Sequence, residues 1–135
     1  MNIYVSGPMT TDSKGKLHGS AEITLLNVMK AKAIGMKLAK LGYVPYVPHT
    51  HIGGWESELN YENIMRIHLT FIRKWADALL FLGPSRGADI EKEEAEKCGI
   101  PVFNSIKNLA EASFIQKPSL CRLNGQQLLL LQQQL

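Results

Sequence analysis

Residues 78–104 constrain the fold most, because they form one strand–helix–strand pattern. An apolar run over 78–82 is followed by Gly, Pro and Ser at 83–85, three residues that favour a turn. A helical pattern covers 88–98, and 101–104 is typical of a second strand. Strands that alternate with helices in this way pack as a parallel sheet, so this unit predicts an α/β fold.

The same alternation extends over most of the chain. Strands are expected at 2–6, 43–47, 78–82 and 101–104. A first helix is expected to end near residue 41, and further helices are expected at 59–75, 88–98 and 107–114. The pattern predicts a doubly wound, Rossmann- or flavodoxin-like parallel sheet of four to five strands, with helices on both faces. We expect one domain over 1–117, while the Leu/Gln-rich tail, 118–135, is expected to be a short helix or disordered.

Two local patterns add detail to this fold. An apolar stripe with spacings of three, four and three residues predicts that the first helix is amphipathic: Leu26, Met29, Ala33 and Met36. The second strand contains Pro45, which cannot donate a ladder hydrogen bond, so we expect this strand to lie near an edge of the sheet or to be irregular.

Composition and charge exclude several classes of protein. With 45% hydrophobic and 20% charged residues in 135, the chain is typical of a globular protein. The net charge is only +3 and its basic residues are scattered, so no nucleic-acid polymer is expected as partner. The cysteines have no metal or redox spacing, and we see no leader or membrane-length apolar run. We therefore expect a cytoplasmic protein without a metal, cofactor or membrane partner.

The carboxyl ends of two expected strands carry the clearest site signal. Ser6-Gly7-Pro8 follows the first strand and 83–85 follows the third, so both turns lie at the same edge of a parallel sheet. A helix begins directly after the second turn, and its first N–H groups can bind an anion. Ser85, Gly87 and Ala88 are thus candidate anion-binding residues, although Ser85 could simply cap the helix.

Glu91 stands one turn into that helix. Helical spacing places it on one face with three small or apolar residues: Ala88, Ala95 and Cys98. A carboxylate on such a face is unfavourable without a function, which makes Glu91 the best catalytic candidate. The alternative is an ordinary solvated glutamate.

Histidines and one tyrosine provide further candidates. His49 and His51 form a pair that could bind zinc, but a loop position beside a small-molecule cleft, or in solvent, fits them better. His68 lies on the apolar stripe of the second helix, where a core histidine and a site residue are both possible. Tyr4 alone would be an ordinary strand aromatic.

Taken together, four motifs resemble the nucleoside 2-deoxyribosyltransferase-like superfamily, especially a branch of small bacterial and phage proteins. They are Ile-Tyr-Val-Ser-Gly-Pro-Met-Thr at 3–10, Met65-Arg66 before Leu69, Ala-Asp-Ala at 76–78, and Ser-Arg-Gly-Ala at 85–88 through Glu91 to Ala95. The resemblance covers about 2–104. It implies that Glu91 attacks the anomeric carbon of a (deoxy)ribosyl group, that Tyr4 orients Glu91, and that Ser85 holds a 5′-phosphate.

The resemblance has one departure. Relatives have an aspartate, which helps to protonate or position the leaving base, where this chain has His68. An imidazole can donate a proton but cannot reproduce the acceptor geometry of a carboxylate. We therefore list Glu91, Tyr4 and His68 as catalytic candidates, and Ser6, Gly7, Pro8, Ser85, Gly87 and Ala88 as substrate- or phosphate-binding candidates.

The expected function is cleavage or exchange of the N-glycosidic bond of a nucleoside or nucleoside 5′-monophosphate. A non-catalytic nucleotide sensor or sequestering protein is the alternative, and a tail that recruits a partner is a third. The resemblance also implies a homo-oligomer. We expect at least a dimer, built partly on the helix over 59–75, whose apolar residues are more numerous than one stripe requires: Ile67, Phe71, Ile72 and Trp75.

Overall fold

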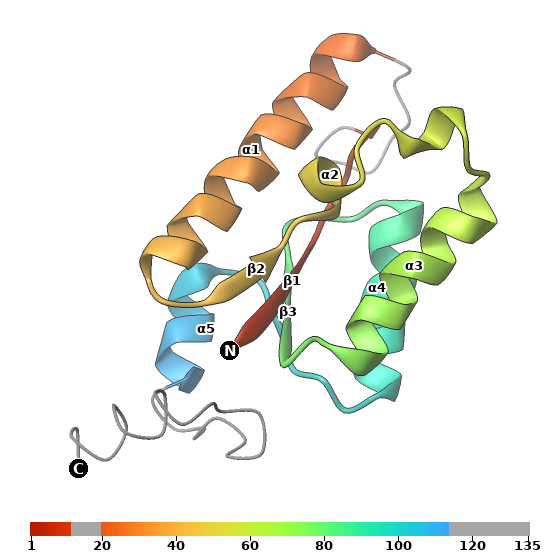
Figure 1. The fold of residues 1–135 in the computed structure, drawn as a ribbon. Coiled ribbons are helices and arrows are strands. Elements are labelled where there is room, and N and C mark those ends of the chain that lie inside the picture. Colours follow the sequence, from red (N-terminus) through yellow and green to blue (C-terminus); the bar gives the residue numbers. More distant parts are fainter. Residues whose placement is uncertain (12–19, 114–135) are drawn as a thin grey trace.

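A computed structural model describes residues 1–11 and 20–113 of the chain. Its sheet has four parallel strands in the order β2-β1-β3-β4 (Figure 1). The strands are β1 (Asn2–Ser6), β2 (Val44–Tyr46), β3 (Ala78–Phe81) and β4 (Val102–Phe103). The predicted α/β fold is confirmed, and so is the edge position of the strand with Pro45. The tail over 118–135 lies outside the described residues.

Helices cover both faces of the sheet, as predicted. They are α1 (Ala21–Lys40), α2 (Pro48–His51), α3 (Tyr61–Lys74), α4 (Arg86–Lys97) and α5 (Ile106–Ser113), with a 3₁₀ turn, η1, at Trp55–Ser57. Figure 1 shows α1 and α5 on one side of the sheet and α3 and α4 on the other. The short helix α2 and the turn η1 occupy a region for which the sequence predicts only a loop.

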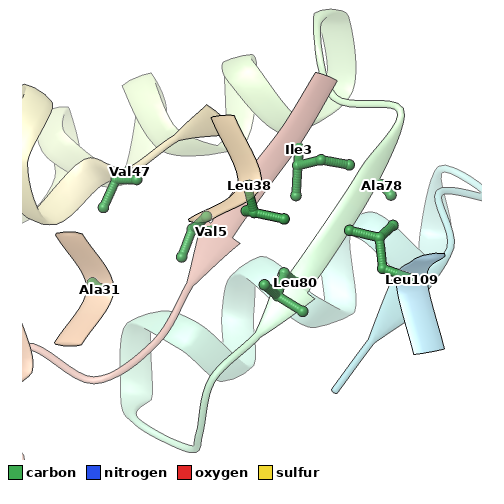
Figure 2. Close-up of a cluster of buried hydrophobic side chains, with 8 residues drawn as sticks. All are labelled: Ile3, Val5, Ala31, Leu38, Val47, Ala78, Leu80 and Leu109. Carbon is green, nitrogen blue, oxygen red and sulfur yellow. The ribbon is translucent and has the colours of Figure 1, made fainter. Parts of the chain in front are cut away.

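The strands separate two cores, because successive side chains of a strand point to opposite faces. Ile3 and Val5 belong to an aliphatic cluster between the sheet and the helices α1 and α5 (Figure 2). Tyr4 belongs to the second cluster, which contains aromatic rings and packs against α3 and α4. The aliphatic cluster comprises Ile3, Val5, Ala31, Leu38, Val47, Ala78, Leu80 and Leu109. The second comprises Tyr4, Tyr46, Ile72, Ala76, Leu79 and Ala95.

The predicted apolar stripe of α1 is on the wrong face. Its buried residues are Ala31, Gly35 and Leu38, whereas all four stripe residues are exposed: Leu26, Met29, Ala33 and Met36. Small side chains explain the difference, because they allow α1 to approach the sheet closely. A Cβ at Gly35 would lie 2.6 Å from Cγ2 of Val47, so only glycine fits there.

The apolar residues of α3 are used within the domain. Ile72 is fully buried, and Phe71 stacks on Tyr46 with ring centroids 4.0 Å apart. Trp75 meets both rings edge-on, and Ile67 is partly buried. The second core therefore accounts for much of the apolar surface of this helix, and the dimer built partly on it stays a prediction.

The topology places a crevice at the carboxyl ends of β1 and β3. The chain passes from β1 to the edge strand β2 and then crosses over β1 to β3, so the connections diverge between β1 and β3. In doubly wound sheets ligands bind at this switch point. Within residues 1–11 and 20–113, no helix has the length and apolar character needed to cross a membrane.

Candidate active site

Glu91 is buried at the switch point. Its helix, α4, begins after Ser85, whose Oγ accepts a hydrogen bond of 3.0 Å from the N–H of Ala88. The Glu91 side chain shares the buried face of α4 with Ala88 and Ala95 and is only 5% exposed. The predicted helix face shared with Ala88 and Ala95 is confirmed, except that Cys98, at the end of the helix, is exposed.

Three side chains surround the carboxylate of Glu91. The hydroxyl of Tyr4 donates to Oε2, and Oγ of Ser6 donates to Oε1 over 2.9 Å. Nδ1 of His68, on α3, lies 3.5 Å from Oε2. Tyr4 and Ser6 both reach Glu91 because residues two apart in β1 point to the same face. The structure thus brings the three catalytic candidates, Glu91, Tyr4 and His68, together.

Burial changes the proton affinity of this group. It raises the pKa of Glu91 to about 7, although the hydrogen bonds from Tyr4 and Ser6 act to lower it. Burial, with a smaller contribution from His49, lowers the pKa of His68 to about 4. Between those pH values the Glu91–His68 pair holds one proton. The pKa of Tyr4 is raised well above 10.0, first by burial and then by Glu91, so its hydroxyl stays a donor.

A cavity of about 620 Å³ opens above Glu91. Six predicted site residues line it: Gly7, His68, Ser85, Gly87, Ala88 and Glu91. The other three, Tyr4, Ser6 and Pro8, do not line it but contact residues that do. Tyr4 and Ser6 are almost fully buried against Glu91, and the carbonyl of Pro8 contacts Nε2 of His49 at 3.1 Å.

Gly7 allows the two strand ends to meet at the cavity. A Cβ at this position would lie 2.9 Å from Cβ of Leu82, closer than real side chains approach. The chain after β1 can therefore pass directly beside the chain after β3 only without a side chain at residue 7. This close approach forms part of the cavity wall.

The amino end of α4 differs from the predicted anion site in its details. The N–H of Ala88 is occupied by Oγ of Ser85, so these two groups satisfy each other. The N–H groups of Arg86 and Gly87 make no hydrogen bond within the described residues. Arg86 and Tyr61 also line the cavity here. The guanidinium of Arg86 lies 5.1 Å from the ring centroid of Tyr61. An anion would therefore meet free N–H groups and a cation.

The sequence did not separate the roles of His49 and His51. His49 is only 6% exposed and lines the cavity, whereas Nδ1 of His51 contacts the backbone of Val47 and its ring packs on Tyr46. The two rings thus point to different surroundings. Among residues 1–11 and 20–113, no group of three or more His, Cys, Asp or Glu side chains is placed to hold a metal ion.

Comparison with known proteins gives one match. No curated protein and no solved structure matches the chain. Residues 1–104 match the family described as "Domain of unknown function (DUF4406)", and this range contains all four strands and every residue of the site described above. Because the match covers well over half of the sequence, the chain belongs to the DUF4406 family.

Proposed function

We propose that this protein cleaves or exchanges the N-glycosidic bond of a nucleoside or a nucleoside 5′-monophosphate, with Glu91 as nucleophile. One observation carries the proposal: a buried carboxylate, oriented by Tyr4 and Ser6, faces a cavity beside N–H groups of α4 that make no hydrogen bond within residues 1–11 and 20–113. The motifs that resemble nucleoside 2-deoxyribosyltransferases include these residues.

The reaction follows a two-step course. The carboxylate of Glu91 attacks C1′ of the sugar, an ester bond forms, and the C1′–N bond breaks with its electron pair moving to the base. The departing base takes up one proton. Water or a second base then attacks C1′, releases Glu91 and gives up a proton. The ester is thus hydrolysed, or the sugar is transferred to the second base, with retained configuration at C1′.

His68 is placed to supply the proton. Its Nδ1 faces Glu91, while Nε2 is buried without a partner in the described part of the chain, and the side chain lines the cavity. Moving the one proton of the pair from Glu91 to His68 creates the nucleophile and the acid in one step.

The pH profile tests this role of His68. The pair loses its proton as the pH rises through about 7, so base release should fall above that pH. Initial rates between pH 5 and 9, a range of about four units around that value, give the profile. A rate that instead rises through pH 7 and stays high would show that ionisation of Glu91 suffices, and would remove His68 as the acid.

Nucleoside and monophosphate panels test the proposal as a whole, with the released base measured by chromatography. Glu91→Gln should lower base release by at least about a thousandfold but retain ligand binding, since the amide keeps the shape without the nucleophile. Glu94→Gln is the matched control, because Glu94 lies on the same helix and pairs with Arg73 instead. Unchanged turnover by Glu91→Gln would overturn the assignment.

The amino end of α4 predicts that monophosphates bind more tightly than their nucleosides. Arg86→Ala should reduce this preference by about tenfold or more, because a hydrogen bond to a charged group is lost. Arg66→Ala, an exposed arginine of α3 outside the cavity, is the control. Equal affinity of wild-type protein for both ligand forms would contradict a phosphate site here.

A non-catalytic nucleotide-binding protein is the second candidate. It is favoured by the pKa values, because at pH 7 His68 is neutral and only about half of Glu91 is ionised. A protein of this kind would bind the same ligands and release no base. Tight binding of a monophosphate with no product after prolonged incubation would establish it.

Assembly and location complete the proposal. We infer a homo-oligomer in which α1 meets a second copy, because α1 has four apolar side chains that are more than half exposed: Leu25, Leu26, Met29 and Met36. Cys98 is exposed and forms no disulfide within residues 1–11 and 20–113, which supports a reducing, cytoplasmic location.

A further inference from the structure

The cavity concentrates polar atoms that have no partner. Within the described residues, four buried side-chain atoms make no hydrogen bond, and three of them belong to residues that line the cavity: Thr11, His49 and His68. Buried polar groups are nearly always paired in folded proteins, so unpaired ones at a cavity need a partner from a ligand or from water. The proposed reaction uses His68 only. Thr11 and His49 therefore remain to be explained.

His49 presents a hydrogen-bond acceptor. Its Nε2 lies 3.1 Å from the carbonyl of Pro8, and a carbonyl only accepts, so Nε2 carries the proton. Burial lowers the pKa of His49, which keeps the ring neutral. Nδ1 is then a bare lone pair, buried and without a partner in the part of the chain that the structure describes. It needs a donor from the ligand.

Thr11 also lines this cavity and carries a hydroxyl. The side-chain amide of Asn27, on α1, donates to the carbonyls of Met9 and Thr11 over 3.0 and 2.7 Å, so the segment after β1 is held in place. Thr11 is 9% exposed and its Oγ1 has no partner among the described residues. A hydroxyl can donate as well as accept.

The strand order places these groups opposite the anion site. β1 lies between β2 and β3, α2 follows β2, and α4 follows β3. His49, on α2, is thus across β1 from Arg86 and Gly87. Met9, Pro48 and Ile52 give the cavity an apolar lining near His49, and Glu56 of η1 lines the cavity as well. With a phosphate at α4 and C1′ at Glu91, the base extends to this apolar end.

We propose that His49 and Thr11 select a nucleobase with an exocyclic amino group, such as adenine or cytosine. The amino group donates to Nδ1 of His49, and the adjacent ring nitrogen accepts from Oγ1 of Thr11. An oxo base, such as hypoxanthine or uracil, places a carbonyl oxygen against the lone pair of His49 and leaves both acceptors unpaired. This inference rests on the proposed function, since it takes the ligand to be a nucleoside or nucleotide.

Binding measurements on matched ligands test the selection. Calorimetric titration uses Glu91→Gln, which does not consume ligand. It compares adenosine monophosphate with inosine monophosphate, and cytidine monophosphate with uridine monophosphate. The amino form should bind at least about tenfold more tightly, as expected when a buried acceptor is left unpaired. His49→Gln in this background keeps an amide donor for Pro8 and replaces Nδ1 by an amide oxygen at a different position, so the ratio should fall towards one.

Control variants separate this effect from a general loss of structure. His51→Gln changes the other histidine of α2, which faces Tyr46, and should leave the ratio unchanged. Thr11→Val, nearly equal in shape, should weaken binding of the amino form about fivefold or more through one lost hydrogen bond. A circular dichroism spectrum like that of the parent confirms the fold of each variant.

Several results would overturn the selection. Equal affinities within both ligand pairs would do so, as would a ratio that His49→Gln leaves intact, or a failure of all four monophosphates to bind. A His49→Gln effect confined to ribose against 2′-deoxyribose would assign Nδ1 to a sugar hydroxyl instead. Amino selectivity without base release would reject the catalytic proposal alone, while base release without selectivity would reject only this inference.

Discussion

The two faces of β1 differ in chemistry although their residues alternate along one strand. Ile3 and Val5 enter the aliphatic cluster of Figure 2, whose members are all apolar. Tyr4 and Ser6 point the other way and both donate to Glu91. The first face needs only complementary shape, whereas the second keeps a carboxylate buried and oriented. One face should therefore determine stability, and the other should determine chemistry.

Leu38→Ala should have the largest effect on stability. Leu38 is fully buried in the aliphatic cluster, so its truncation should lower the free energy of unfolding by about 2–5 kcal/mol. Base release per folded molecule should not change. Urea denaturation and an active-site titration measure the two quantities. The exposed Leu41→Ala is the control, with an effect within about 0.5 kcal/mol.

The Glu91–His68 pair makes a second prediction, on the pH dependence of stability. The pKa of Glu91 is raised from 4.5 to about 7, so its contribution is full below pH 4.5 and is lost as the pH rises to about 7. The pKa of His68 is lowered from 6.5 to about 4, so its contribution is full above pH 6.5 and is lost as the pH falls to about 4. In the wild type these opposite trends nearly cancel between pH 4.5 and 6.5.

Single variants should reveal each trend separately. Glu91→Gln should become more stable as the pH rises through this range, and His68→Asn should become less stable, each by roughly 3 kcal/mol at about 1.4 kcal/mol per pKa unit. Urea denaturation at several pH values measures this. Parallel curves for wild type and both variants would contradict the assigned protonation states, and His51→Asn is the control.

Tyr4→Phe should reduce base release by about tenfold to a hundredfold, through loss of a hydrogen bond to a charged group. That bond also lowers the pKa of Glu91, so the pH above which activity falls should move upward. Tyr46→Phe is the control from the same core. It removes a buried hydroxyl without a partner in the described residues, and should leave activity unchanged and stability equal or higher.

Met29→Lys should change stability least, by less than about 0.5 kcal/mol, because Met29 is 57% exposed on α1. If α1 joins two copies, Met29→Lys places a charge in the contact between them. The oligomer should then become a monomer, as measured by light scattering at micromolar concentration. Lys30→Ala on the same helix should not have this effect. A wild-type monomer at that concentration would contradict the assembly proposal.

Segments with strong hydrophobic patterns made the fold predictable from the sequence. The face of α1 that is buried against the sheet was not predicted. Hydrophobicity marked Met29 and Met36, while Ala31 and Gly35 carry the contact because small side chains permit close packing. Similarly, the sequence indicated that Phe71 belongs to an apolar surface beyond the needs of one domain, whereas in the structure its ring stacks on Tyr46. Partners distant in sequence decide such cases, and local periodicity does not contain them.

The candidate site shows the same division. Glu91 and its small-residue face could be predicted from helical spacing, and Ser6 from its place at the carboxyl end of a strand, whereas the role of Tyr4 was implied only by the family resemblance. The involvement of His49 could not, because α2 is a single turn without periodicity and the ring is placed by Pro8. Ser85 was equally consistent with a cap and with a phosphate ligand, and only the bond from Ala88 shows that it caps α4.

Tyr4 and Glu91, which are in direct contact, stand 87 residues apart in the sequence. Their site exists only after the chain from β1 to α4 has folded, so a ligand held there binds the complete fold and opposes global unfolding. At ten times its Kd such a ligand adds about 1.4 kcal/mol. Proteases in a cell act on the unfolded fraction, so the lifetime of this protein should follow the supply of its own ligand.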